Sequence, residues 1–104
     1  MVDYRVDISE PAEKDLMDIV RYINSQLSAP GAALKIMEDF EKALTSLSKF
    51  PQRCPMVVDE GLAKIGYRKL IVNNYIVFFS INEKAMIVDV ERILYYRRDW
   101  LRFI

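Results

Sequence analysis

Histidine is absent from this 104-residue chain, and cysteine occurs once, at Cys54. Histidine is the commonest metal ligand and general base in proteins, and a zinc site needs three or four histidine, cysteine or carboxylate ligands. The sequence therefore predicts no metal and no cofactor, and it excludes catalytic pairs in which a histidine activates a serine or a cysteine. A single cysteine cannot form a disulfide within the chain, which favours a reducing cytoplasm.

Glycine clusters, long apolar runs and net charge are also absent. The three glycines, at 31, 61 and 66, do not cluster, which excludes a phosphate-cradling loop. The longest apolar run, 75–79, is far shorter than the roughly 18 residues of a membrane span, and the N-terminus lacks the pattern of a signal peptide. Basic and acidic residues both number 15, so no overall charge attracts nucleic acid or membrane. We expect a single cytoplasmic domain over 1–104 with no membrane partner.

Charge is nevertheless distributed unevenly along the chain. Residues 1–48 carry five Lys/Arg and nine Asp/Glu, a balance of −4, whereas residues 49–104 carry ten and six, a balance of +4. An asymmetry between halves indicates an interaction surface. An equally good interpretation is that the two halves fold together and their surface charges average out.

Hydrophobic periodicity predicts a strand followed by two helices. Apolar and charged residues alternate over 2–8, as in a strand with one buried face. Ser9-Glu10-Pro11 then supplies the capping, acidic and proline residues of a helix start. Two apolar stripes follow on either side of a break at 28–31, and Phe50-Pro51 ends the second helix, so we expect an antiparallel hairpin. The stripes are Ala12, Leu16, Ile19, Val20, Ile23 and Leu27, and then Ala33, Ile36, Met37, Phe40, Ala43, Leu44 and Leu47.

Three further strands are predicted at 66–72, 75–81 and 86–93, with Asn73-Asn74 in the first tight turn. The run 75–81 is apolar on both faces and should be a central strand. The apolar C-terminal run 100–104 should dock on the rest of the chain. The predicted class is α+β: an N-terminal strand and a long antiparallel helical hairpin packed on a mainly antiparallel sheet, in the order β-α-α-β-β-β.

Arginine, lysine and tyrosine are the residues left to carry chemistry. Arginines bind phosphates through two parallel hydrogen bonds and tyrosine rings stack on bases, so their mixture is typical of surfaces that contact RNA or DNA. A solvated strand face whose tyrosines fill a small core would have the same composition. The residues concerned are Arg53, Lys64, Arg68, Lys69, Arg92, Arg97, Arg98 and Arg102, with Tyr67, Tyr75, Tyr95 and Tyr96.

Several short motifs occur in a fixed order along nearly the whole chain. They include Ser9-x-x-Ala12-x-x-Asp15-Leu16-x-x-Ile19, Leu47-x-x-Phe50-Pro51-x-Arg53, Gly66-Tyr67-Arg68-x-Leu70 and Val90-x-Arg92-Ile93-Leu94-x-x-Arg97-Arg98-Asp99. No single motif is specific. Together, in this order, they resemble the RelE/ParE superfamily of bacterial toxins from type II toxin–antitoxin modules.

This resemblance implies a toxin that inhibits growth until a cognate antitoxin neutralises it, as in plasmid stabilisation, and that reaches operator DNA only through the antitoxin. Two targets are known in the superfamily. ParE-like members inhibit DNA gyrase and have no known hydrolytic activity, whereas RelE-like members are ribosome-dependent endonucleases that cut mRNA (mRNA interferases). The chain is thus a non-enzymatic inhibitor on the first interpretation and an endoribonuclease on the second.

The resemblance also implies candidate site residues. If the chain is a nuclease, the catalytic set is Arg68, Arg92, Tyr95, Tyr96 and Arg97. The residues implied to bind the target or the antitoxin are Arg53, Lys64, Arg68, Arg92, Arg97, Arg98 and Trp100.

Departures from the nuclease pattern favour the gyrase interpretation. Nuclease members carry Tyr-Arg-x-x-Tyr on the central strand, and alignment on Tyr75 places Ile76 and Phe79 where the arginine and second tyrosine should be. The Leu-His-x-Arg-Arg-Asp stretch common in ParE-like members appears here with Tyr95 in the histidine position. The long helical hairpin is ParE-like as well. Inhibition of gyrase is therefore the first hypothesis, and cleavage of mRNA on the ribosome is the alternative.

Overall fold

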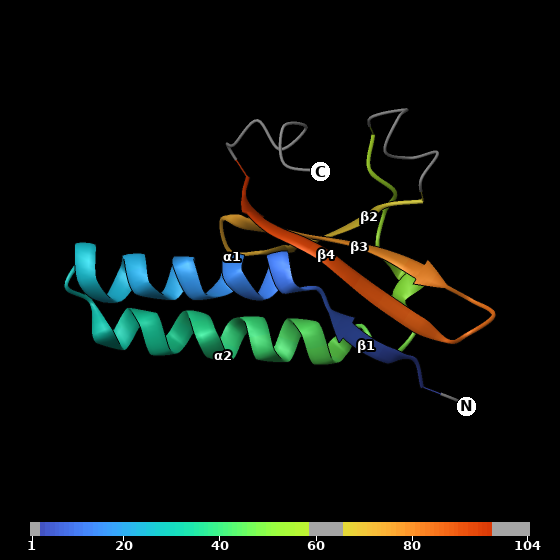
Figure 1. The fold of residues 1–104 in the computed structure, drawn as a ribbon, viewed down its shortest axis with the longest axis horizontal. Coiled ribbons are helices and arrows are strands. Elements are labelled where there is room, and N and C mark those ends of the chain that lie inside the picture. Colours follow the sequence, from blue (N-terminus) through green and yellow to red (C-terminus); the bar gives the residue numbers. More distant parts are fainter. Residues whose placement is uncertain (1–2, 59–65, 97–104) are drawn as a thin grey trace.

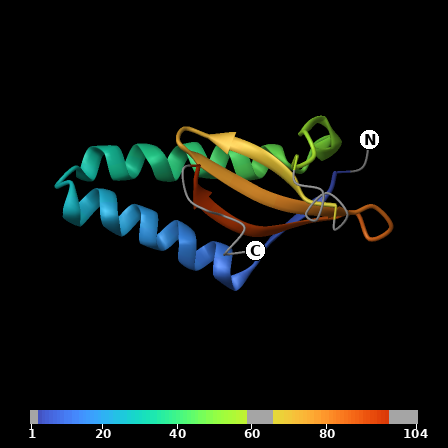
Figure 2. The same ribbon diagram turned by 90° about the horizontal axis from the view of Figure 1, so that it is seen from above.

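The computed structural model describes residues 3–58 and 66–96 and has the predicted α+β architecture. The two long helices lie side by side, the sheet packs against them, and the loop end of the hairpin projects beyond the sheet (Figures 1 and 2). The elements are β1 (Arg5–Ile8), α1 (Glu10–Arg21), a π-helix (Tyr22–Gln26), α2 (Pro30–Ser46), a 3-10 helix (Pro51–Arg53), β2 (Arg68–Val72), β3 (Tyr75–Asn82) and β4 (Ile87–Tyr95).

The four strands form one sheet in the order β1-β4-β3-β2. β2, β3 and β4 form an antiparallel meander, while β1 pairs parallel with β4, so the sheet is mainly antiparallel as predicted. β3 has neighbours on both sides, and its residues 76–79 are buried. The prediction of a central strand is confirmed.

Buried side chains fill both faces of the sheet. The larger cluster joins the hairpin to one face and includes Phe40, Leu47 and Phe79. A smaller cluster on the other face contains Ile76 and Phe78 together with Val57 and Leu94. This double burial explains why β3 is apolar at successive positions rather than alternating.

The first helix begins where the sequence predicts and changes geometry before its expected end. The Oγ of Ser9 accepts a hydrogen bond from the Ala12 N–H at 3.1 Å, which is the expected N-cap. From Tyr22 the helix becomes a π-helix, closed by the Leu27 N–H donating to the Tyr22 carbonyl at 3.2 Å. Leu27, the last residue of the predicted stripe, lies just past the π-helix and is 55% exposed.

The second helix ends four residues before Phe50, at Ser46, so the predicted end at Phe50-Pro51 is wrong. Leu47 still packs in the core after the helix has ended. Phe50 itself adopts the left-handed conformation with φ 44° and its side chain is exposed. Met37 is also half exposed, because it lies on the side of α2 that turns away from the sheet.

The turns of the meander agree with the sequence. Asn73 has φ 53°, the left-handed conformation that asparagine tolerates and that the β2–β3 turn needs. At the β3–β4 turn the Asn82 side-chain oxygen accepts a hydrogen bond from the Ala85 N–H at 3.0 Å. The C-terminal run 100–104, predicted to dock, lies outside the described residues.

Candidate functional site

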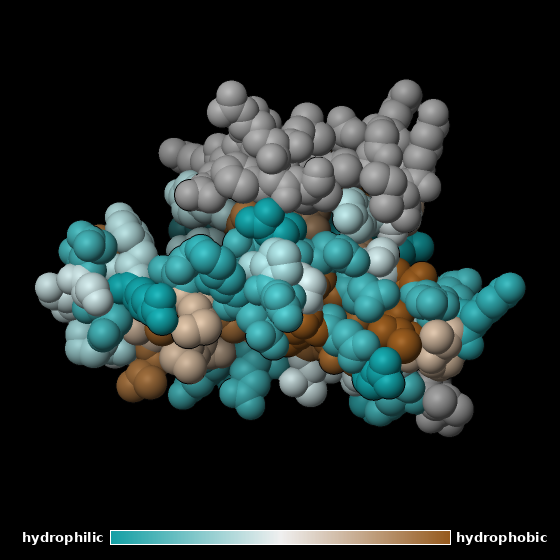
Figure 3. Space-filling view, viewed as in Figure 1, coloured by the Kyte–Doolittle hydropathy of each residue, from teal (hydrophilic) through white to brown (hydrophobic). Residues whose placement is uncertain are grey.

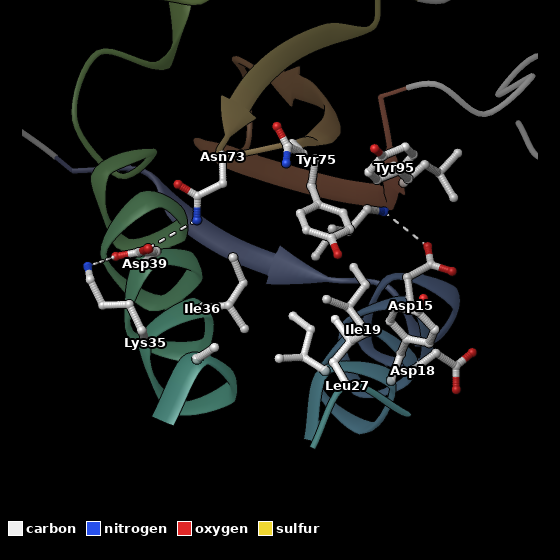
Figure 4. Close-up of a pocket in the computed structure, with 16 residues that line it drawn as sticks. Asp15, Asp18, Ile19, Leu27, Lys35, Ile36, Asp39, Asn73, Tyr75 and Tyr95 are labelled. Carbon is white, nitrogen blue, oxygen red and sulfur yellow. Dashed lines mark hydrogen bonds and ion pairs between the residues drawn. The ribbon is translucent and has the colours of Figure 1, made fainter. Parts of the chain in front are cut away.

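A groove of about 820 Å³ opens between the helical hairpin and the end of the sheet; we call it the hairpin groove. Its walls are α1 with the π-helix on one side and α2 on the other, and the β2–β3 turn and the end of β4 close it above (Figure 4). Apolar side chains line its interior and carboxylates stand at its rim. The main lining residues are Asp15, Asp18, Ile19, Leu27, Lys35, Ile36, Asp39, Asn73, Tyr75 and Tyr95.

Tyr75 points from the central strand into the hairpin groove between the two helices (Figure 4). Its ring packs against Phe40 and Tyr95, with ring centroids 5.7 and 5.8 Å away. Burial raises the pKa of Tyr75, and the neighbouring phenols of Tyr95 and Tyr22 raise it further, so the hydroxyl stays protonated. Among the described residues the Tyr75 hydroxyl has no hydrogen-bond partner, which leaves it available to a ligand in the groove.

Asp39 ties the β2–β3 turn to α2 at one rim of the groove. Its carboxylate receives Lys35 Nζ at 2.6 Å and the side-chain N–H of Asn73 at 3.1 Å. The hydrogen bond from Lys35 and then that from Asn73 lower the pKa of Asp39, so this rim carries a carboxylate at neutral pH.

Asp15 connects the opposite rim to β4. Its two oxygens receive Nε and Nη2 of Arg92 at 2.7 and 2.8 Å, and the Ile93 backbone N–H donates to the same carboxylate at 3.0 Å. The side chains of Asp15 and Arg92 are only 13% and 21% exposed. The hydrogen bond to Asp15 raises the pKa of Arg92, which keeps the guanidinium protonated.

The described arginines among the predicted site residues bind their own chain in three different places. The Arg53 guanidinium donates to the carbonyls of Ser46, Lys49 and Phe50, at 3.3, 2.7 and 3.2 Å, and so closes the end of α2. Arg68 is anchored differently, through the carbonyls of the segment before β2. It donates to Gln52 and Cys54 at 3.2 and 2.7 Å.

Tyr95 and Tyr96 are the predicted site residues that the structure brings together. Their ring centroids are 5.2 Å apart, and the two residues are 38% and 41% exposed. Arg68 is not beside them, because Tyr95 pairs across β3 with the far end of β2. Four residues of strand, roughly 13 Å, separate Arg68 from that end. Lys64, Arg97, Arg98 and Trp100 lie outside the described residues.

Sequence reasoning missed the roles of Asp15 and Tyr75 in this groove. A signal was present for Asp15, which falls between Ala12 and Ile19 on the apolar stripe of the helix. A carboxylate on a buried stripe requires a partner. The partner could not be identified from the sequence, because Arg92 lies 77 residues away.

Neither a metal site nor a membrane span is found in the described part of the chain. Within residues 3–58 and 66–96, no three acidic or cysteine side chains are grouped so that they could hold a metal ion. The helices of the same ranges are too short or too polar to cross a membrane.

Comparison with known proteins identifies one family and several related folds. A family model described as "ParE toxin of type II toxin-antitoxin system, parDE" matches residues 6–100. No curated protein sequence matches the chain.

Solved structures with this fold come from bacteria and an archaeon. A chain of the chromosomal ParDE system of P. aeruginosa superposes with TM-score 0.72 at 19% identity, covering 88% of this chain and 95% of that one. The RelBE2 toxin–antitoxin complex of Mycobacterium tuberculosis superposes with TM-score 0.65 at 22% identity, covering 91% of this chain and 93% of that one. The RelE–RelB complex of Pyrococcus horikoshii superposes with TM-score 0.55 at 18% identity, covering 92% of this chain and 98% of that one.

Proposed function

This chain belongs to the ParE toxin family of type II toxin–antitoxin systems, and from that premise we propose that it arrests bacterial growth until a cognate antitoxin neutralises it. The family model matches residues 6–100 and spans both helices and β2 to β4 completely, so the assignment rests on nearly the whole chain. We place the activity in the cytoplasm, where it would stabilise the plasmid or chromosomal segment that encodes the pair.

We propose DNA gyrase as the target, and the observation that carries this choice is the burial of the central strand. Ile76 and Phe79 occupy the positions of the arginine and tyrosine in the nuclease pattern, and they are 8% and 0% exposed. Each is packed in a different hydrophobic cluster. A phosphate-cleaving site needs preorganised donors, and the loss of one typically costs a hundred- to a thousandfold in rate.

The contacts of the described arginines support the same choice. Arg92 would have to leave the carboxylate of Asp15 before it could bind a phosphate, and Arg68 would have to leave two backbone carbonyls. Both departures would leave partly buried polar groups without partners, at about 1–3 kcal/mol for each group. These arginines support the fold more readily than they support cleavage of RNA.

One observation favours the alternative target, the ribosome with its mRNA. Tyr95 and Tyr96 present adjacent, partly exposed rings, and the sequence continues with Arg97 and Arg98. Aromatic rings beside arginines can stack on unpaired bases. RelE-like cleavage of mRNA is therefore the second candidate function.

We propose that the antitoxin lays an amphipathic helix in the hairpin groove and an extended segment along the meander, which belongs to the basic half of the sequence, residues 49–104. The groove has the apolar interior that a helix-in-groove contact needs, from Ile19, Leu27 and Ile36, and the Tyr75 hydroxyl supplies a polar handle. The related structures from M. tuberculosis and P. horikoshii are complexes of a toxin with its antitoxin. Operator DNA would be bound through the antitoxin alone.

Induction of the chain in bacteria, with and without the gene beside it, tests the toxin function. Arrest that the neighbouring gene product relieves is expected. Normal growth despite a soluble, folded product would contradict the proposal.

The target is tested with purified protein in two parallel assays: supercoiling by gyrase, and cleavage of mRNA on programmed ribosomes. We expect loss of supercoiling with intact transcripts, and double-strand breaks with an SOS response in cells. Codon-specific cleavage that the Tyr95→Ala/Tyr96→Ala double variant abolishes would instead establish the nuclease.

A further inference from the structure

β4 extends beyond the strand that pairs with its outer edge. β1 pairs with β4 only over Ile87–Val90, whereas β4 continues to Tyr95. Past Val90 no strand from residues 3–58 or 66–96 pairs with the outer edge of β4. Backbone N–H and C=O groups at such an edge need other partners.

Residues at the start of α1 supply those partners in place of a strand. The Ser9 N–H donates to the Val90 carbonyl at 3.0 Å, and the Ser9 hydroxyl donates to the Glu91 carbonyl at 2.8 Å. Asp15, six residues further along the helix, continues the series by accepting the Ile93 N–H at 3.0 Å. The helix thus covers the edge that β1 leaves open.

The Asp15 carboxylate does more than satisfy one backbone group. It receives three hydrogen bonds, two of them from the guanidinium of Arg92. A bidentate contact between charged groups fixes the orientation of both side chains as well as the distance between them. Residues 92 and 93 of β4 are therefore held to α1 by a side chain and by the backbone at once.

This contact lies directly after an irregularity in the sheet. Phe78 pairs with Arg92 and Phe79 pairs with Val90, so Glu91 is an extra residue that bulges out of the register. A bulge bends its strand and changes the direction in which the strand continues. Asp15 holds β4 at the first two residues beyond the bend. The next residues are Leu94, Tyr95 and Tyr96. The Tyr96 N–H donates to the Asn74 carbonyl at 2.9 Å.

We infer that Asp15 is a positioning residue for Tyr95 and Tyr96, two of the site residues implied by the resemblance. Through Arg92 and the Ile93 N–H it sets the direction of the last residues of β4, and so the placement of these two side chains. For any contribution of these two tyrosines to growth arrest, the inference rests on the proposed toxin function. It rests on the geometry alone for the role of Asp15 in holding β4.

The test compares Asp15→Asn with a matched control, Asp7→Asn. Asp7 also receives Nε and Nη2 of an arginine, Arg5, at 3.0 Å each, but the pair lies within β1 and does not touch the end of β4. Three quantities are measured for each variant: amide hydrogen exchange at Ile93, Leu94 and Tyr95, growth arrest on induction, and inhibition of gyrase per mole of folded protein. The folded amount is determined by near-ultraviolet circular dichroism.

For Asp15→Asn we expect exchange at these amides to rise about tenfold or more, because the neutral amide can no longer bind the guanidinium through two charged oxygens. Toxicity per folded molecule should fall by about tenfold or more, since small displacements of binding groups have large effects. Asp7→Asn should change neither quantity by more than about twofold. Equal exchange and equal toxicity in Asp15→Asn and the wild type would overturn the inference.

A second variant keeps the inference testable if Asp15→Asn does not fold. Arg92→Lys retains the positive charge beside Asp15 but cannot bond both of its oxygens. It should show intermediate exchange at Ile93 and intermediate toxicity, and wild-type toxicity with faster exchange would refute a positioning role. Growth arrest does not presuppose a target, so failure of wild-type protein to inhibit gyrase would reject the proposed target without deciding the role of Asp15.

Discussion

Phe50 is a residue whose backbone conformation does not suit its side chain. It adopts φ 44°, in the left-handed region that costs a bulky residue about 1–3 kcal/mol, and it precedes a proline. The residue is 65% exposed, so little packing compensates for the strain. The position joins α2 to the 3-10 helix, which indicates that the turn is imposed by the burial of Leu47 and Pro51 on either side.

Replacing Phe50 by glycine should therefore stabilise the protein. Glycine adopts this conformation without strain, and we expect the free energy of unfolding to rise by roughly 1 kcal/mol. The larger conformational entropy that glycine loses on folding offsets part of this gain. Urea denaturation of Phe50→Gly and Phe50→Ala distinguishes the causes. Alanine removes the exposed ring but keeps the strained backbone, so a gain in Phe50→Ala as large as in Phe50→Gly would show that the ring and not the backbone was responsible.

Glu91, the bulged residue of β4, has an unfavourable environment for a charge. Burial raises its pKa, and the nearby carboxylate of Asp89 raises it further. A carboxyl group whose pKa is higher in the folded state binds protons more tightly when folded, so its ionisation destabilises the fold as the pH rises through that folded pKa. The penalty is absent below the unfolded pKa and complete above the folded one.

Glu91→Gln should remove this penalty. We expect its denaturation midpoint to exceed that of the wild type near pH 7, and the difference to vanish near about pH 4, where the wild-type carboxyl is protonated. Denaturation curves at several pH values measure the difference. A gain that stayed constant down to low pH would point to packing instead of charge.

At the scale of the elements, the end of α2 depends on a side chain that comes after it. Arg53 donates to three carbonyls near this helix end and to Ser46 Oγ at 2.9 Å, in place of the glycine that commonly follows a helix. The last carbonyls of a helix have no partner within it, and a positive charge beside them is favourable.

Arg53→Ala should destabilise the helix end, by about 1 kcal/mol for the loss of a surface hydrogen-bonded group. Thermal unfolding should show a lower midpoint, and amide exchange should rise in residues 44–49. Arg53→Lys keeps the charge but loses the fork of donors, so it should recover part of the loss. If Arg53→Ala unfolds like the wild type but binds its target or antitoxin less well, Arg53 is a binding residue as first predicted from the resemblance.

At the scale of the whole molecule, the acidic half of the sequence forms β1 and the helical hairpin, and the basic half contributes the meander. Hydrophilic side chains cover much of the visible helical face, with apolar patches between them (Figure 3). Two exposed leucines distinguish the surfaces of the hairpin. Leu27 lines the hairpin groove, and Leu34, 63% exposed, does not.

Leu27→Glu should weaken binding of the antitoxin by about tenfold or more in the dissociation constant, because a charge would enter the apolar part of the groove. Leu34→Glu is the matched control and should bind as the wild type does. Both leucines are more than half exposed, so both variants should fold. Titration calorimetry of each variant with the antitoxin gives the comparison. Equal affinities for all three proteins would place the antitoxin helix elsewhere.

The meander and the start of the hairpin follow from local patterns that are visible in the sequence. Ser9 before a proline-containing turn specifies the helix start, Asn73 permits the left-handed turn, and the doubly apolar run of β3 specifies a central strand. Each of these signals acts over a few residues, which is why it survives folding unchanged. The resemblance to the superfamily, now confirmed by the family match, rests on the same short-range patterns in their order.

Long-range contacts decided the rest. The sequence does not show that Asp15 would meet Arg92, that Arg68 would bind carbonyls before β2, or that β1 would pair parallel with β4. Composition alone presented the arginines as a phosphate-binding group, whereas in the fold each described one satisfies a partner of its own chain. The physical reason is that an unpaired, partly buried charge or backbone group is costly, and only the packed chain determines which distant partner removes that cost.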